Sequence, residues 1–431
     1  MKRNLSPPVI AALAAALLTA AFAVPSPTLG KTTMELLVWG DTVRWQPILE
    51  DFHAQYPDLE LLMTQQGGNA YTLQEGLIVR TLGGAPPDLA FTHFNTHADL
   101  VRRGLFADLT PYLERDGVDL YETFPRGVVD FFTTDGRVTG LPMQLSTHLL
   151  WYNKSLFDSH GLGYPTRDWR MTEELLDHAR RLTRDLDGDG LNDQWGIEII
   201  NMHTNADHFW KTMKWTPDLR HSNLLDPKIT EAYTWVHDLY NTWNVSSPTI
   251  DTYQAFTQGR LAMIGGIQTT YSRFSGMAYD WDIEVWPISP GGEITYGSGA
   301  GIAMVAGARN AEAAWTFLKY WMRPETQQMA IEIGFIPGGP AALAAYFETF
   351  SPANVGLDFT PNSFTNRRAL VDSFDRVFAQ PAPPNSQAVS ALFSQHFPKL
   401  RTGEAAPTAI LRAAHDQLEA VLREAWEALE Q

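Results

Sequence analysis

The chain of 431 residues contains no cysteine. Disulfide bonds, thiol nucleophiles and cysteine metal sites are therefore excluded. We also expect no lipid anchor, because a bacterial lipoprotein carries its lipid on a cysteine at the cleavage site. Whatever holds the fold together or binds a ligand must use other chemistry.

Positive charge is scarce. Lys and Arg number 32 against 49 Asp and Glu, which gives a formal net charge of -17. Such a chain repels phosphate backbones and anionic lipid headgroups, so we expect no nucleic-acid partner and no peripheral membrane binding. The apolar fraction of 44% is enough to bury a large core, and the length suggests two or three domains.

Long apolar runs are confined to the N-terminus. Residues 9–24 are rich in Ala and Leu, follow Lys2 and Arg3, and contain an A-x-A cleavage pattern at residues 21–23. This is typical of a secretory signal peptide, so we predict that residues 1–23 are cleaved and that the mature protein is periplasmic or extracytoplasmic. An uncleaved membrane anchor is the alternative, but the run is short for a span and small residues and prolines follow it.

Strands and helices alternate at the start of the mature chain. Residues 34–39 are an apolar run, residues 45–56 place apolar side chains at helical spacing, and residues 59–63 are apolar again. This order predicts a βα unit of an α/β fold with a mostly parallel sheet. Trp39 ends the first strand, and the carboxyl ends of strands line the ligand crevice in open α/β sheets. Core packing is the alternative for this side chain.

A long strand is predicted at residues 143–152, after a Gly-Leu-Pro turn. Its end is apolar and aromatic, whereas Gln144, Ser146 and Thr147 at its start are polar. The pattern indicates a strand that enters from a turn and finishes buried.

An acidic turn follows at residues 185–196. Asp185, Asp187, Asp189 and Asp193 have the spacing of the first half of a calcium loop, in which carboxylate oxygens wrap the ion. The acid expected at the twelfth position is missing, because Gly196 stands there. Two hypotheses remain open, a structural calcium ion and a solvated turn without one.

Three motifs occur in the order found in one protein family. Residues 152–157 (YNKSLF) resemble the YNKxLF signature of bacterial extracellular solute-binding proteins of family 1, which are similar to maltose-binding protein. Residues 100–109 (LVRRGLFADL) and 256–263 (FTQGRLAM) match two further family motifs. The resemblance implies a two-lobe periplasmic-binding-protein fold of type II, in which each lobe is a mixed, mostly parallel sheet flanked by helices. It also implies hinge crossovers, with one lobe at 32–141 plus 266–312 and the other at 142–265 plus 313–431.

The function implied by the resemblance is that of a receptor for an ABC importer. The lobes would close over a sugar or oligosaccharide and present it to a membrane permease, as a monomer without covalent chemistry or a required cofactor. Sugars are bound by amides, carboxylates and hydroxyls together with aromatic faces. In the family a loop, here residues 92–96, reaches the cleft, and Gln268 stands where an aromatic residue or amide often touches ligand. The candidate ligand contacts are Trp39, Asp41, Asn69, Tyr71, Asn95, Gln144, Ser146, Trp210, Gln268, Tyr271, Trp286, Gly299 and Phe335.

Two alternatives remain. The same fold could bind a non-sugar solute such as a polyamine, a peptide or glycerol phosphate, although the predicted cleft loops carry few basic residues for an anion. A secreted glycosidase would need two carboxylates facing each other across a cleft. Asp41 and Glu293 fall near the predicted cleft, but nothing in the sequence pairs them.

Overall fold

The computed structural model describes residues 30–40, 42–333, 335 and 357–431. The predicted signal peptide and Asp41 lie outside this part of the chain. Within the described ranges, no helix is both long enough and apolar enough to cross a membrane.

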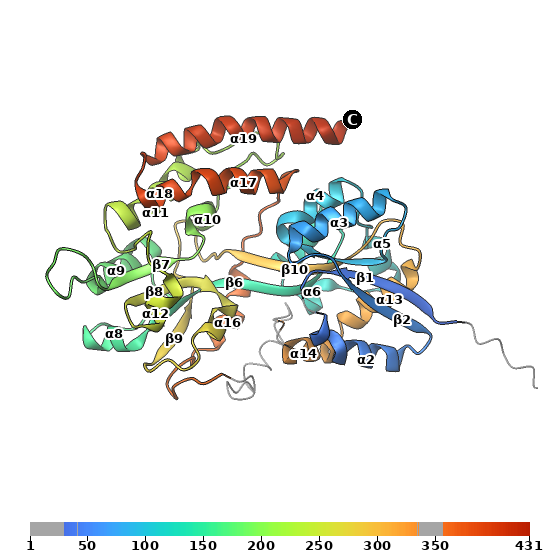
Figure 1. Cartoon of the computed structure of the whole chain (residues 1–431), viewed down its shortest axis with the longest axis horizontal. Helices are drawn as coiled ribbons and strands as arrows, with labels where there is room; N and C mark the ends of the chain where they lie inside the picture. Colours follow the sequence, from blue (N-terminus) through green and yellow to red (C-terminus); the bar gives the residue numbers. More distant parts are fainter. Residues whose placement is uncertain (1–29, 41, 334, 336–356) are drawn as a thin grey trace, which may run out of the picture.

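The first half of the molecule is built on the sheet β2-β1-β3-β10-β6. β1 is parallel to β2 and β3, whereas β10 is antiparallel to β3 and β6. The strands are β1 (Thr32–Val38), β2 (Leu59–Gln65), β3 (Leu89–His93), β6 (Leu141–Asn153) and β10 (Gly297–Met304), with a small hairpin of β4 (Thr133–Thr134) and β5 (Arg137–Val138). The helices are η1 (Val43–Trp45), α2 (Gln46–Gln55), α3 (Ala70–Leu82), α4 (Phe94–Arg102), α5 (Thr110–Asp116), α6 (Leu120–Thr123), α7 (Arg126–Val129), η2 (Asp130–Phe132), α13 (Ala311–Trp321) and α14 (Pro324–Glu332). They lie on both sides of the sheet (Figure 1).

The second half contains a smaller sheet. β8 and β9 are both antiparallel to β6, and β7 is parallel to β8. The strands are β7 (Trp195–Ile199), β8 (Leu261–Ile267) and β9 (Trp281–Val285). The helices are α8 (Lys154–Ser159), η3 (Met171–Leu175), α9 (Leu176–Leu182), α10 (Met202–Phe209), α11 (Pro227–Asn241), α12 (Thr252–Thr257), η4 (Gln268–Arg273), α16 (Arg368–Asp372) and η6 (Phe374–Arg376).

β6 belongs to both halves. Its partner is β10 up to the pair Thr147 and Gly297, and becomes β8 from the pair His148 and Ile267. Figure 1 shows β6 and β10 running between the two halves. The predicted long strand and the mixed α/β fold are therefore confirmed.

The YNKSLF motif holds the end of β6 in place. The Asn153 side chain caps α8 by accepting a hydrogen bond of 3.1 Å from the amide of Leu156. Lys154 donates to the backbone oxygen of Asn362 at 3.0 Å and lies 4.0 Å from Asp282. Phe157 is fully buried. The motif thus joins the second-half sheet to a distant segment, which is a structural role.

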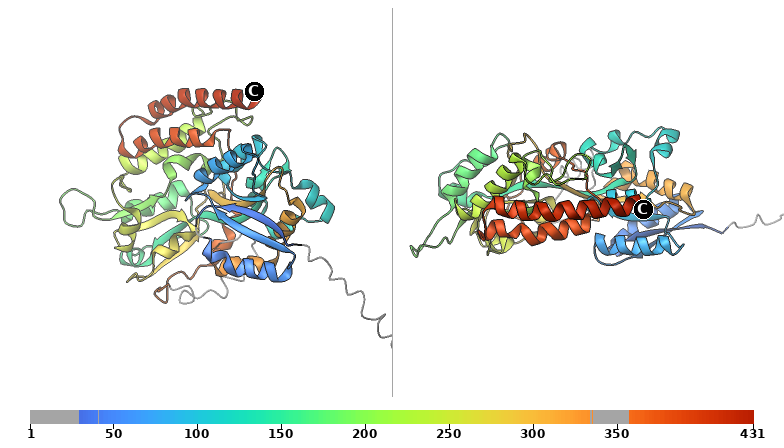
Figure 2. Two further views of the ribbon diagram at one scale, coloured as in Figure 1. Left: turned by 45° about the vertical axis from the view of Figure 1, so that its right-hand side comes forward. Right: turned by 90° about the horizontal axis from the view of Figure 1, so that it is seen from above.

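The last three helices form a layer over the second half. They are α17 (Ser386–His396), α18 (Pro398–Thr402) and α19 (Pro407–Glu430). Leu411, Leu418 and Leu422 on α19 share one apolar core with α11, and Phe397 packs on Tyr233 with 4.7 Å between ring centroids. In Figure 2, α17 and α19 run side by side as the two long red helices.

The strand and helix contacts differ from the predicted lobe boundaries at two places. β9 falls in a segment assigned to the first lobe, yet it pairs with the second half of β6. α13 falls mostly in a segment assigned to the second lobe, yet its Trp321 donates to the backbone oxygen of Pro142 at 2.9 Å, and its Tyr320 donates to Asp51 on α2 at 2.8 Å. These bonds hold α13 on the first half.

The predicted loop at residues 92–96 is wrong. β3 continues to His93, and α4 begins at Phe94. The His93 ring accepts a hydrogen bond from the amide of Asn95 at 3.4 Å, and His97 and Leu100 are buried on the inner face of the helix. The first amides of a helix have no partner within the helix, and here the side chain of His93 caps one of them.

Candidate functional site

A cavity of about 360 Å³ lies between the two halves. Residues far apart in the sequence line it, from α3, α4, α10, the segment before β10, the segment before α17, and α17 itself. The lining residues are Tyr71, Phe94, Asn95, Asn201, His203, Thr204, Asn205, His208, Lys214, Trp215, Tyr296, Gln380, Ala382, Pro383, Ser386, Val389, Ser390, Phe393 and Ser394. This size suits a small ligand.

The first-half wall is formed by two helix starts. Asn69 caps α3, and its side-chain oxygen accepts hydrogen bonds of 3.0 Å from the amides of Tyr71 and Thr72. Tyr71 is thereby held in the first turn, where it lines the cavity. Phe94 and Asn95 open α4 on the same wall. Asn69 itself does not line the cavity, so its part is to position Tyr71.

The second-half wall is the polar helix α10. It begins after Asn201, which has a left-handed backbone with φ of 58°. Asparagine tolerates this conformation better than most residues. The backbone oxygen of Asn201 accepts hydrogen bonds from Thr204 at 3.0 Å and from the Asn205 amide at 3.1 Å. These bonds hold Thr204 and Asn205 near the carboxyl end of β7, where both side chains line the cavity.

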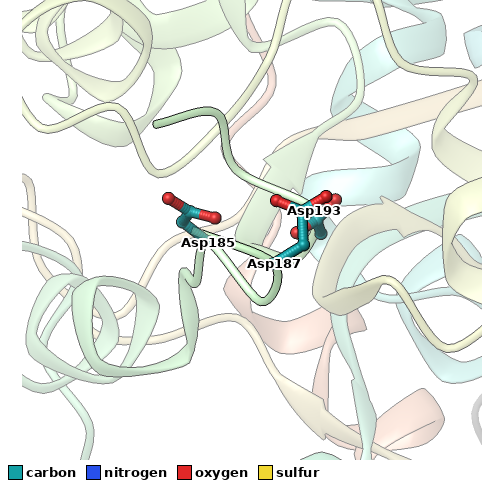
Figure 3. Close-up of side chains that lie close together, drawn as sticks. All are labelled: Asp185, Asp187 and Asp193. Atoms are coloured by element: carbon teal, nitrogen blue, oxygen red, sulfur yellow. The ribbon is translucent and has the colours of Figure 1, made fainter. Parts of the chain in front are cut away.

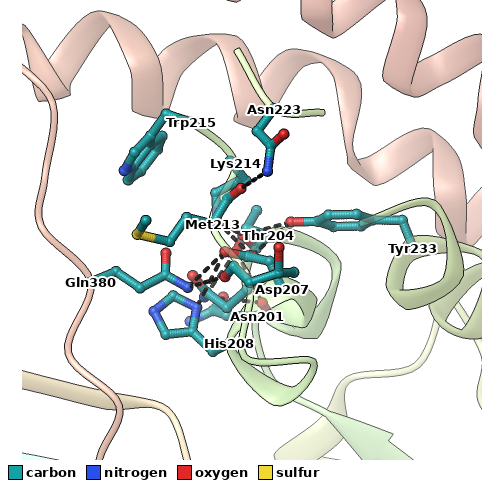
Figure 4. Close-up of polar contacts among 12 residues, drawn as sticks. Asn201, Thr204, Asp207, His208, Met213, Lys214, Trp215, Asn223, Tyr233 and Gln380 are labelled. Atoms are coloured by element: carbon teal, nitrogen blue, oxygen red, sulfur yellow. Dashed lines mark hydrogen bonds and ion pairs between the residues drawn. The ribbon is translucent and has the colours of Figure 1, made fainter. Parts of the chain in front are cut away.

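One buried carboxylate behind this wall holds Lys214 and Gln380, which line the cavity (Figure 4). Asp207 is fully buried and accepts hydrogen bonds from Lys214 at 2.6 Å, from the Tyr233 hydroxyl at 3.0 Å and from the Gln380 amide at 2.9 Å. Lys214 also donates to the backbone oxygen of Thr204 at 3.1 Å. We call Asp207, Lys214, Tyr233 and Gln380 the Asp207 network.

The network leaves the cavity close to electrically neutral. Burial alone would raise the pKa of Asp207, but the charge of Lys214 and the hydrogen bonds from Lys214 and His208 outweigh it and hold that pKa well below its usual range. Burial lowers the pKa of His208, and lowers the pKa of His203 to about 4. At neutral pH the two histidines are therefore uncharged, and the lysine is neutralised by the carboxylate.

Aromatic rings complete the cavity. Tyr296 stands edge-on to His208 and Phe94, with ring centroids 4.9 Å and 6.2 Å away. Trp215 is fixed by a hydrogen bond of 3.0 Å from its indole nitrogen to the backbone oxygen of Pro381. The arrangement offers flat apolar surfaces beside hydroxyl and amide groups. Among the described residues that line the cavity, none is Asp or Glu.

Two of the predicted ligand contacts, Tyr71 and Asn95, come together in this cavity. Trp39 is half-buried against Phe91, with 5.4 Å between ring centroids. Phe335 is buried beside Trp45. Neither lines the cavity.

The predicted contacts in the second half lie in or near its core. Trp210 is 4% exposed and Trp286 is fully buried. Gln268 is also fully buried and donates to the backbone oxygen of Leu370 at 3.3 Å. Tyr271 stacks on Phe364 with 5.5 Å between centroids. None of these four side chains lines the cavity.

The remaining three predicted contacts lie where β6 and β10 cross between the halves. Gln144 pairs with Ala300, and Ser146 pairs with Ser298. Gly299 lets the two strands approach closely, because a Cβ atom there would lie 2.7 Å from Leu145. None of the three lines the cavity, and whether they touch ligand stays a prediction.

The acidic turn brings three of its four predicted ligands together (Figure 3). Asp185, Asp187 and Asp193 each place a carboxylate oxygen within 4.8 Å of the others. Backbone amides already engage these groups: Asp193 accepts from Leu186 at 2.8 Å, and Asp187 accepts from Asp189 at 3.1 Å. Asp189 is not part of the cluster.

The structure explains why the twelfth position of this turn is glycine. A Cβ atom at Gly196 would lie 1.9 Å from the backbone oxygen of Ala179 on α9, so no acidic side chain fits there. A complete calcium loop with a bidentate acid is therefore excluded at this position. Calcium binding by the three aspartates stays a prediction, which the melting temperature with and without calcium would test.

Comparison with known proteins matches residues 39–328 to the model of the bacterial extracellular solute-binding protein family. The maltotriose-binding protein of Pyrococcus abyssi is 23% identical over 303 residues, 68% of this chain and 63% of that relative, so the match spans less than two thirds of its length. The sugar-binding protein of Xanthomonas citri shares the fold with a TM-score of 0.77 at 19% identity, over 93% of this chain and 100% of that one. An ABC substrate-binding protein of Listeria monocytogenes, solved with cycloalternan, has a TM-score of 0.72 at 22% identity, over 91% and 99%. The family match covers most of the chain and agrees with the two-part fold, and the chain belongs to the bacterial extracellular solute-binding protein family.

Proposed function

We propose that this chain is an extracytoplasmic receptor that captures a neutral sugar or oligosaccharide between its two halves and delivers it to the permease of an ABC importer. The observation that carries the proposal is the wall of the cavity, which combines amides and hydroxyls with aromatic rings and no net charge. Sugars present hydroxyls that donate and accept hydrogen bonds, and apolar ring faces that pack on aromatic side chains. The names of the maltotriose- and cycloalternan-binding relatives agree with this ligand class.

Capture would use closure of the two halves. β6 crosses between them, and the chain crosses back between β9 of the second half and β10 of the first half. Such crossings between two halves act as hinges. Closure of the halves would bring Tyr71 and Asn95 towards α10 and bury the ligand. The closed surface would then be the form that a permease recognises.

The alternatives fit the cavity less well. A polyamine or a peptide amine needs an unpaired carboxylate, and glycerol phosphate needs a free cation, because a buried charge is costly without a partner. The Lys214 charge is already neutralised by Asp207 at 2.6 Å. A glycosidase needs two facing carboxylates. Glu293, one of the two candidates, instead forms an ion pair of 3.0 Å with Arg376.

Thermal shift and tryptophan fluorescence of the mature protein test the proposal. The panel should contain mono- and oligosaccharides including maltose and maltotriose, with spermidine, a peptide and glycerol 3-phosphate as controls. We expect saturable binding of a neutral saccharide without hydrolysis, weakened in Asn95→Ala and unchanged in Asn362→Ala, which alters an exposed residue outside the cavity. Binding of only the charged solutes, or turnover of an oligosaccharide, would overturn it.

We further propose that residues 1–23 are removed on export and that the mature receptor works as a monomer, without a nucleic-acid partner. The mass of the exported protein would show the cleavage site. Light scattering with and without saccharide would show the oligomeric state.

A further inference from the structure

We propose that Lys214 is a ligand-binding residue, which donates a hydrogen bond from its ammonium group to a hydroxyl oxygen of a saccharide in the cavity. The inference rests on the proposed function of that cavity and names one of the residues that would recognise the sugar. Sequence patterns do not indicate it, because Lys214 lies in an irregular segment after α10.

The hydrogen bonds of Lys214 leave room for one more acceptor. An ammonium group has three hydrogens to donate. Two are directed to Asp207 at 2.6 Å and to the backbone oxygen of Thr204 at 3.1 Å. Lys214 lines the cavity although only 4% of its surface is exposed, so ordinary solvent has little access to the third hydrogen. The ring centroids of Trp215 and Phe393 lie 5.6 Å and 5.4 Å from the ammonium nitrogen, and a ligand oxygen is a better hydrogen-bond acceptor for the third hydrogen than either ring.

Gln380 supplies the complementary acceptor. Its amide nitrogen donates to Asp207 at 2.9 Å and to the backbone oxygen of Thr212 at 2.8 Å, which fixes the orientation of the amide. Its side-chain oxygen is buried and has no hydrogen-bond partner in the described part of the chain. A sugar hydroxyl can accept from Lys214 and donate to Gln380 at the same time, which would satisfy both groups.

Asp207 and Tyr233 act as positioning residues in this scheme. Asp207 holds the lysine and the glutamine with its two carboxylate oxygens, and Tyr233 donates to the same oxygen as Lys214, at 3.0 Å. The buried ion pair is costly to desolvate, and an apolar pair of similar size often serves a fold equally well. A purely structural role would therefore leave binding unchanged when both charges are removed together.

The test is the double variant Asp207→Asn with Lys214→Met, which removes both charges without leaving one unpaired. The matched control is Asp282→Asn with Lys154→Met, a carboxylate–lysine pair outside the cavity in which the carboxylate is buried and the lysine is half-buried. Isothermal titration calorimetry would use maltotriose, or the panel saccharide that saturates the wild type. Because a hydrogen bond from a charged donor is worth about 1.5–3 kcal/mol, we expect binding about 10- to 150-fold weaker in the cavity variant and unchanged in the control.

Equal affinity in the wild type and both double variants would overturn the inference and leave the proposed function standing. If no saccharide binds the wild type, both fall together. Should the cavity variant fail to fold, NMR of wild-type protein labelled with ¹³C-lysine gives the answer directly. The Lys214 side-chain signal should move on saccharide binding while that of Lys154 stays in place, and a stationary Lys214 signal would refute direct contact.

Discussion

Replacing Glu198 with glutamine should remove a large part of the pH dependence of stability. Glu198 is 3% exposed on β7, accepts a hydrogen bond of 2.6 Å from the Tyr240 hydroxyl and lies 3.5 Å from Arg401. Burial raises its pKa to about 7 from an ordinary 4.5, although Arg401 and Tyr240 favour the charged form. The unfolded carboxyl loses its proton near pH 4.5, whereas the folded one keeps it until about pH 7. Unfolding therefore releases a proton in this window, and stability falls as the pH rises.

The size of the effect follows from the pKa difference between the two states. At 1.36 kcal/mol per pKa unit, a rise from 4.5 to about 7 corresponds to a loss of about 3 kcal/mol between pH 4.5 and pH 8. Urea unfolding of the wild type and Glu198→Gln at both pH values measures it, because other titrating groups are common to both proteins and cancel. We expect the stability difference between them to shift by about 3 kcal/mol in favour of the variant at pH 8. The same difference at both pH values would refute the reasoning.

Three further substitutions test local features. Gly196→Ala should lower the free energy of unfolding by about 1–3 kcal/mol or more, because its Cβ would meet the backbone of Ala179, and a wild-type urea curve would contradict this. Asn69→Ala should cost about 1 kcal/mol in the same assay and also weaken saccharide binding, since Tyr71 depends on that cap; unchanged affinity would show that the cap does not position Tyr71. At Asn201, glycine should be tolerated while valine costs about 1–2 kcal/mol, and equal melting temperatures would contradict the left-handed backbone.

The fold could be predicted because its signals are local. An apolar run with a polar start marked β6, and the adjoining YNKSLF motif fixes the turn into α8 through Asn153 and Lys154. The lobe boundaries could not be read in the same way. Which half a segment joins depends on its partner, and both β9 and α13 are compatible with either half until their pairing is known.

The candidate site was only partly predictable, for a related reason. Tyr71 and Asn95 could be anticipated because each lies near a strand end or a helix start that faces the crevice. Tryptophans gave no such guidance, because an aromatic ring fits a core as well as a ligand face. Trp286 is fully buried, and its ring packs so closely on Gly265 that a Cβ atom there would lie 2.6 Å from it. The missing side chain of Gly265 thus makes room for the buried ring.

The Asp207 network lies furthest from what sequence patterns can show. Its carboxylate and Gln380 are 173 positions apart, and Lys214 sits in a segment with no regular structure. Only the return of the chain before α17 brings the glutamine against α10. The groups that would bind a sugar hydroxyl therefore come from segments that are far apart in the sequence. Relatives that keep the same strands can then change ligand by exchanging residues at such junctions, which explains how one fold can serve many solutes.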